Sequence, residues 1–172
     1  MSEEATSEVE QPATLMMAAG AILAVFYGVY ALWSGFGAVM GCLGTGVSGL
    51  AAMSDDGAIF GLIWSLFSLM LSSLSVLIYA ALAGAGGYVA MTASSFKELL
   101  ELERVQRAVL LLGIIPVVGI LTNGVISIAQ FSCCGLMFGL FPQLIVGGLA
   151  GAAAYMGHQA LQSEGVKEAF HE

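Results

Sequence analysis

Three long stretches of this chain contain no Asp, Glu, Lys or Arg. They comprise 44 residues between Glu10 and Asp55, 40 between Asp56 and Lys97, and 56 between Arg107 and Glu164. A helix needs about 20 apolar residues to cross a bilayer, so each stretch has room for at least one span and the last has room for two. Because 59% of the residues are apolar and only 9% are charged, the sequence predicts an all-α integral membrane protein.

Four membrane spans are predicted, at residues 14–40, 58–92, 106–130 and 136–157. The first span ends where GCLGTGVSG begins, because each Gly inside a helix costs about 1 kcal/mol relative to Ala, and FSCCG divides the last stretch. The leader at residues 1–12 is small and acidic and cannot bury enough apolar surface to become ordered, so it is expected to be disordered. The tail at residues 158–172 is expected to return to water.

The few basic residues predict the orientation of the chain in the membrane. Lys97, Arg104 and Arg107 lie between the second and third spans and Lys167 follows the fourth, so four spans place every Lys and Arg on one side. By the positive-inside rule this side is cytoplasmic, and both termini then lie inside. A five-span arrangement, with the first stretch split after Gly35 and the N-terminus outside, also satisfies the rule. Either arrangement predicts a multi-pass protein of the cell membrane.

The first segment is expected to stay in the membrane. A secretory signal peptide begins with a positively charged region, but MSEEATSEVE contains four Glu and neither Lys nor Arg.

Helix signals also occur in the charged segment SSFKELLELERVQR between the second and third spans. Ser95 and Glu98 have the spacing of a capping box, and Glu103 and Arg107 form a favourable i,i+4 pair. We therefore expect a cytoplasmic helical extension at residues 96–107 that continues into the third span. Its apolar side chains either pack on the second span or offer a docking surface to a cytoplasmic partner. These side chains are Phe96, Leu99, Leu100 and Leu102.

Small and polar residues recur at steps of three and four on each predicted span, and we call them the seam. The seam comprises Tyr27, Tyr30, Ser34, Gly37, Gly41, Ser65, Ser68, Ser72, Ser75, Tyr79, Gly119, Asn123, Ser127, Gln130, Gln143, Gly147 and Gly151. A repeat averaging 3.5 residues keeps one face toward the neighbouring helices and predicts a left-handed four-helix bundle. Lipid tails are as apolar as Leu, so close backbone approach and interhelical hydrogen bonds must hold such helices together.

The seam has a second interpretation, a hydrophilic path along the axis of the bundle. Conducting paths usually display ionisable groups in the membrane, but none of the four predicted spans contains Asp, Glu, Lys or Arg. The packing interpretation is therefore favoured within one chain.

No catalytic residue, metal site or cofactor is predicted. Acid–base chemistry within the membrane would need a carboxylate or His at depth, and the one candidate is His158 at the cytoplasmic end of the fourth span. The motifs G-x-S-x-G, P-loop and H-E-x-x-H are absent. The net charge of −8 and the lack of a basic patch argue against nucleic acid as a partner.

Four spans would place the three cysteines at the outer end of the protein. If the membrane is a bacterial cytoplasmic membrane, this side is oxidising, and Cys42 could then form a disulfide with Cys133 or Cys134. The alternative is that all three are small packing residues. Zinc is disfavoured, because no His lies near them and their spacing is unusual for a zinc site.

The end of the chain resembles a known group of proteins. The segment SCCGLMFGLFP at residues 132–142, followed by a span and by EGVKEAF at residues 164–170, resembles the C-terminal part of small uncharacterised bacterial multi-span membrane proteins. The resemblance implies a bacterial membrane setting and four spans. The group has no established activity to carry over.

These observations predict a non-enzymatic membrane protein. We expect it to act as an accessory or scaffold subunit, or to assemble with itself, through its small-residue helix faces. Its partners would then be the lipid bilayer and other membrane subunits or further copies of the chain. The alternative function is an oligomeric channel or small-solute permease with a hydroxyl-lined path.

Overall fold

The computed structural model contains four long helices, which are α1 (Glu3–Ala52), α2 (Gly57–Lys97), α3 (Leu102–Ala129) and α4 (Cys133–Gln162). It describes residues 3–52, 57–98, 101–129, 133–164 and 166. Each helix contains a stretch long and apolar enough to cross a membrane, namely Val9–Leu43, Ile59–Lys97, Leu102–Ile128 and Gly139–Gln162. The chain is a multi-pass membrane protein by these criteria, and the prediction of an all-α protein with four such helices is confirmed.

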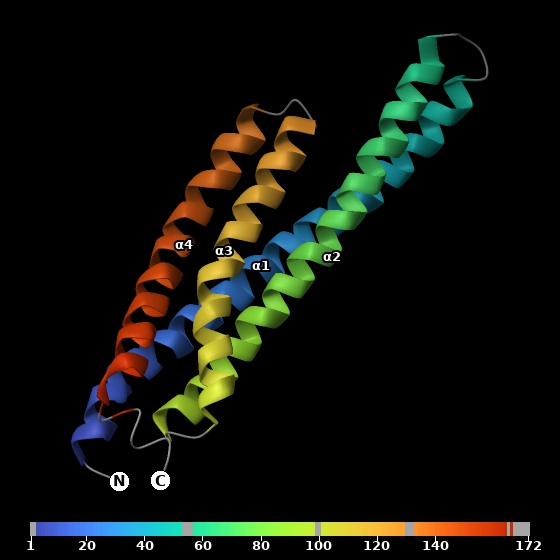
Figure 1. Ribbon diagram of the computed structural model, residues 1–172. Helices are drawn as coiled ribbons and strands as arrows, with labels where there is room; N and C mark the ends of the chain where they lie inside the picture. Colours follow the sequence, from blue (N-terminus) through green and yellow to red (C-terminus); the bar gives the residue numbers. More distant parts are fainter. Residues whose placement is uncertain (1–2, 53–56, 99–100, 130–132, 165, 167–172) are drawn as a thin grey trace.

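The helices form two antiparallel hairpins of unequal length. α1 packs chiefly on α2, and α3 packs chiefly on α4. The shorter α3–α4 hairpin lies against the half of α1–α2 nearest the chain termini, and the loop end of α1–α2 extends well beyond it (Figure 1). All four helices line one cavity, and on the side toward the α1–α2 loop its lining ends at Gly37 of α1 and at Ser72 of α2. We call the part beyond them, residues 38–52 and 57–71, the arm.

The backbones of α1 and α2 lie close together at Gly20 and Gly86. A Cβ atom on Gly20 would lie 2.6 Å from the backbone nitrogen of Ala90, and one on Gly86 would lie 2.8 Å from the backbone nitrogen of Ala24. Only a residue without a side chain lets the two backbones come this close, and close approach is a main source of helix association in lipid. Neither glycine belongs to the predicted seam.

Large apolar side chains fill the space between the four helices on the side of the termini. Met16, Leu23, Val89, Leu112 and Ile115 are at most 1% exposed. They come from α1, α2 and α3, and half-buried Val146 and Ala154 of α4 pack against this cluster. This end of the protein is a packed core.

The turn between α2 and α3 differs from the predicted helical extension at residues 96–107. α2 continues to Lys97, so Ser95 lies inside α2, and α3 begins only at Leu102. Phe96 at the end of α2 and Val105 at the start of α3 are both fully buried. The chain reverses direction between them, and this lets both side chains reach the core. The predicted capping box therefore does not begin a helix.

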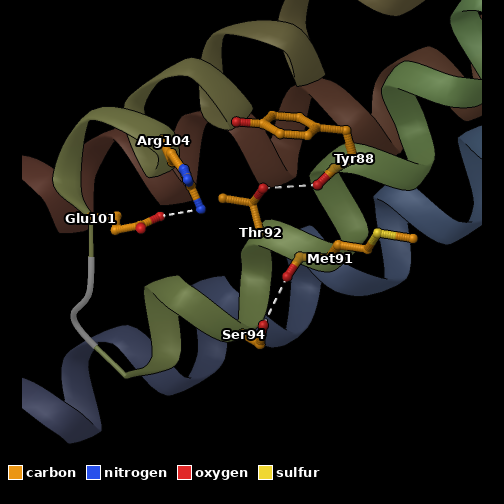
Figure 2. A network of polar contacts seen from close by, with 6 residues as sticks. All are labelled: Tyr88, Met91, Thr92, Ser94, Glu101 and Arg104. Carbon is orange, nitrogen blue, oxygen red and sulfur yellow. Dashed lines mark hydrogen bonds and ion pairs between the residues drawn. The ribbon is translucent and has the colours of Figure 1, made fainter.

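Glu101, the residue immediately before α3, caps the start of that helix. Its φ angle is 52°, and its carbonyl accepts hydrogen bonds from the backbone nitrogens of Arg104 and Val105 at 2.9 and 3.2 Å. Figure 2 shows the Arg104 side chain reaching back to the Glu101 carboxylate, an ion pair of 2.6 Å. The nearby hydroxyls of Thr92 and Ser94 bond only to carbonyls of their own helix. The predicted pair of Glu103 and Arg107 is also present.

The leader also differs from its prediction. Residues 1–12 were expected to be disordered, but α1 begins at Glu3. Val9 is fully buried, and Glu10 forms an ion pair of 3.4 Å with Lys97 at the end of α2. Composition alone predicts too little order here. The leader only extends a helix that the membrane-spanning residues have already nucleated, and extending a helix costs less free energy than nucleating one.

Candidate functional site

A cavity of about 500 Å³ lies where the α3–α4 hairpin meets the base of the arm. All four helices contribute to its wall. The lining residues are Val29, Tyr30, Trp33, Ser34, Gly37, Ser72, Ser75, Tyr79, Asn123, Ile126, Ser127 and Gly139. Most of the polar lining belongs to the predicted seam, and none of the described lining residues is charged.

A cluster of aromatic rings lies at the inner end of the cavity. Tyr27 and Tyr79 stack with their ring centroids 6.0 Å apart, and Tyr30 meets Tyr79 edge-on at 5.4 Å. Phe26 packs against both tyrosines of its own helix, at 5.3 and 4.8 Å. Each such pair contributes about 0.5–1.5 kcal/mol beyond the area it buries, so the cluster fixes α1 against α2 at this level.

Two glycines provide the space that the side chains of Tyr27 and Asn123 occupy. A Cβ atom on Gly119 of α3 would overlap the phenol group of Tyr27, and one on Gly139 of α4 would overlap the amide of Asn123. The Tyr30 hydroxyl also donates a hydrogen bond to the Gly139 carbonyl at 3.3 Å. Gly139 is not part of the predicted seam, although its spacing of four from Gly135 forms a G-x-x-x-G pair, which is a weak packing signal by itself.

Two buried amide side chains at the site lack ordinary hydrogen bonds. Asn123 is 9% exposed and Gln143 is fully buried. Neither Nδ2 of Asn123 nor Nε2 and Oε1 of Gln143 has a hydrogen-bond partner among the described residues. Leaving such groups unpaired usually costs about 1–3 kcal/mol each, so their retention needs an explanation.

The serine stripe of α2 does not form a ladder of bonds between helices. Ser65 donates to the Gly61 carbonyl and Ser75 to the Ser72 carbonyl, both at 2.7 Å and both within α2. Ser75 is buried, whereas Ser65, Ser68 and Ser72 are half-buried. Ser65 and Ser75 therefore donate their protons to the local backbone, and Ser72 and Ser75 present small polar surfaces to the cavity.

The remaining seam residues have mixed surroundings. Gly41 packs on the Leu69 side chain and Gly147 on the Pro116 ring. Gly151 is exposed with open space around it, whereas Ala150 and Ala153 are buried. Including Gly151 in the packing face was therefore wrong by one position. Gln130 lies outside the described residues.

The predicted disulfide and metal chemistry can be compared with the structure in part. Cys42 carries a free, exposed thiol on α1, at odds with a bridge to Cys133 or Cys134, whose side chains lie outside the described part. Within residues whose placement is described, no group of His, Cys, Asp or Glu could hold a metal ion. His158 is exposed, and its Nε2 lies 2.9 Å from Nε2 of Gln162.

The predicted docking surface also lies partly inside the protein. Phe96 is fully buried, and Leu102 is half-buried and packs on the core. Leu99 and Leu100 lie outside the described residues. Phe96 cannot serve a partner from this position, so the packing interpretation holds for it.

The chain matches no protein-family model, no curated protein and no solved structure.

Proposed function

We propose that this protein is a non-enzymatic subunit of the cell membrane that assembles with a second copy of itself through the arm. The observation that carries this proposal is the length of the apolar α1–α2 hairpin. The region of α1 from Ala13 to Ala52 holds no charged residue and extends about 60 Å at 1.5 Å per residue. The hydrocarbon core of a bilayer is only about 30 Å thick.

The shorter hairpin fits this thickness. In α3 the uncharged region from Ala108 to Ala129 is about 33 Å long. If α3 and α4 set the level of the bilayer, the arm carries apolar side chains past it. Leu43, Phe60 and Met70 of the arm are 64%, 74% and 73% exposed. Water does not tolerate such a surface over a large area, so a protein partner must cover it.

An exposed glycine in the arm favours a helix of another chain as the partner that covers the apolar surface. Gly61 is exposed on α2, and a Cβ atom there would meet no atom within 4 Å. Small residues at a lipid-facing or partner-facing surface let a second backbone approach closely. A pair of identical hairpins can contact each other by a two-fold axis, which needs no second gene product. The arm contains no charge that would select a different partner.

We further propose a four-helix bundle with both termini in the cytoplasm. Lys97, Arg104 and Arg107 are exposed and lie at the end where α2 connects to α3, opposite the loops of the two hairpins, and both chain termini lie at this same end (Figure 1). The positive-inside rule assigns this end to the cytoplasm. The arm then points away from the cytoplasm.

The alternative of a channel or small-solute permease draws support from the polar cavity. A path through one chain would continue from the cavity toward the termini, where Leu23, Leu112 and Ile115 are buried in the packed core. Four helices close more naturally around such a core than around a pore. Assembly is therefore the better-supported function, and a liposome flux assay with ions and small neutral solutes tests the alternative.

The assembly proposal is tested by the mass of the purified protein in mild detergent and in nanodiscs. We expect the wild type to be a dimer and Gly61→Leu to be mainly monomeric. Gly113→Leu is the matched control, because Gly113 of α3 is also exposed with nothing within 4 Å but lies outside the arm. A monomeric wild type, as expected if the hairpin only tilts, contradicts the proposal. A complex with a different membrane subunit overturns the choice of a second copy.

A further inference from the structure

We propose that the cavity is a binding site for a neutral, lipid-soluble molecule that carries a carbonyl group. In this site the carbonyl oxygen accepts a hydrogen bond from Nδ2 of Asn123, and the flat or apolar body of the molecule lies among the side chains of Tyr30, Trp33 and Tyr79. This binding site is independent of the assembly through the arm.

Asn123 is the residue that points to a ligand. It lines the cavity, is nine-tenths buried, and its Nδ2 has no hydrogen-bond partner among the described residues. The amide packs against Gly139, whose carbonyl is already the acceptor for Tyr30. A buried donor without a partner is rare in native structures. Nδ2 lies against Gly139, so a turn of the amide about χ2 toward the cavity would present it to an acceptor placed there.

The charge of the lining restricts the ligand to neutral molecules. Among the lining residues that the structure describes, none is Asp, Glu, Lys, Arg or His. An ion in this cavity would lose its hydration without gaining an opposite charge, which is costly within a membrane. The site therefore discriminates against carboxylates, phosphates and ammonium groups.

The aromatic residues restrict the shape of the ligand. Trp33 stands at the rim, 77% exposed, and Tyr30 and Tyr79 close the inner end with a mutual ring distance of 5.4 Å. Flat or apolar groups pack well against such faces. The cavity volume of about 500 Å³ is in the usual range for sites of small organic ligands.

The position of the cavity indicates binding rather than passage. It lies between the two hairpins at the base of the arm, and below it the buried rings of Tyr27 and Tyr79 lead into the packed core. A lipid-soluble molecule can enter sideways between the hairpins. Two sources offer the required chemistry, namely a free carbonyl compound such as a quinone and the ester carbonyl of a membrane glycerolipid.

The test uses the intrinsic fluorescence of Trp33. The chain has two tryptophans, so Trp64→Phe leaves Trp33 as the only reporter. Menadione, a small quinone that quenches tryptophan, is titrated into this full-length variant in detergent, and the retained lipid is extracted and weighed by mass spectrometry. We expect saturable quenching, or one retained glycerolipid per chain that menadione displaces. The first result identifies a free carbonyl compound as the source, and the second identifies the lipid.

Asn123→Leu should raise the half-saturating concentration of menadione about tenfold, or remove the retained lipid, because one good hydrogen bond corresponds to about that factor. Thr122→Val, which removes a hydroxyl from the neighbouring position outside the cavity lining, should leave both readouts unchanged. Ser127→Leu fills the cavity and should abolish both, even if Asn123→Leu does not fold. Quenching that never saturates, together with equal lipid content in all variants, would mean a cavity that holds only water and would overturn the proposal.

Discussion

The hydroxyl of Tyr30 in α1 donates a hydrogen bond to the backbone carbonyl of Gly139 in α4, 109 positions further along the chain, at 3.3 Å. The Asn123 amide of α3 packs against the same glycine, and the Tyr30 ring packs against Tyr79 of α2. This small region therefore joins all four helices. In lipid, where hiding apolar side chains gives no net attraction between helices, such contacts decide how the hairpins dock.

Replacing Tyr30 by Phe should test the strength of this link. The variant keeps the ring but loses the hydrogen bond, and we expect the free energy of unfolding to fall by about 0.6–1.7 kcal/mol, the range found for interhelical bonds in membranes. Tyr155→Phe is the control, because the Tyr155 hydroxyl accepts a bond only from Gln159 of its own helix. The measurement is unfolding in mixed detergent micelles. Equal stability of both variants would show that the Tyr30 hydroxyl does not hold α4.

The crossing of α1 and α2 predicts opposite behaviour for two adjacent glycines. A Cβ atom on Gly86 would lie 2.8 Å from a backbone nitrogen and 3.0 Å from a carbonyl oxygen of α1, while one on Gly87 would meet nothing within 4 Å. We expect Gly86→Ala to destabilise the protein by about 1–3 kcal/mol, because backbone atoms cannot move aside as a side chain can. Gly87→Ala should be neutral or slightly stabilising, since Ala favours helix. Thermal unfolding followed by circular dichroism measures both, and equal losses would contradict the crossing.

The rhythm of small and polar residues predicted part of the site. Ser75, Tyr79, Asn123 and Ser127 are all buried on one side of their helices, since steps of three and four keep side chains on one face. The rhythm does not say which helices meet. The contact of Tyr27 with Gly119 and the close approach of α1 and α2 at Gly20 and Gly86 therefore could not be predicted from it.

The element boundaries were harder to predict for a different reason. Ser95 and Glu98 have the spacing of a capping box, yet α2 continues through Ser95 and the buried Phe96 and ends at Lys97. Here tertiary packing, and not the local capping signal, determines where the helix ends. In the same way, Gly151 and Ala150 are both small, and only the packing of α4 on its neighbouring helices decides that Ala150 is the buried one.

The turn at Glu101 predicts a strained backbone that a different residue would relieve. Its φ of 52° is unfavourable for most side chains but well tolerated by Asn, which is also a good residue before a helix. Glu101→Asn should match or exceed wild-type stability by up to about 1 kcal/mol, because the ion pair with Arg104 that it loses is exposed and contributes little. Glu101→Val should be destabilising by about 1–3 kcal/mol, since a β-branched residue strongly disfavours this conformation. Unfolding midpoints of the two variants that do not differ would contradict this backbone geometry.

The proposed orientation and the reach of the arm make a joint prediction about Cys42. This thiol is free and exposed, and it lies about 44 Å along α1 from Ala13, beyond the thickness of the hydrocarbon core. In a Cys133→Ser, Cys134→Ser variant, a membrane-impermeant maleimide added to intact cells should label Cys42. Ser94→Cys in a background lacking the native cysteines is the control, because Ser94 is exposed near the basic end of α2 and should react only after the cells are permeabilised. Labelling of Ser94→Cys in intact cells would reverse the proposed orientation. A Cys42 that stays unlabelled in both intact and permeabilised cells, and also in the Gly61→Leu variant that lacks the second copy, would mean that the arm tilts within the bilayer, and the case for its assembly outside the hydrocarbon core would then fail.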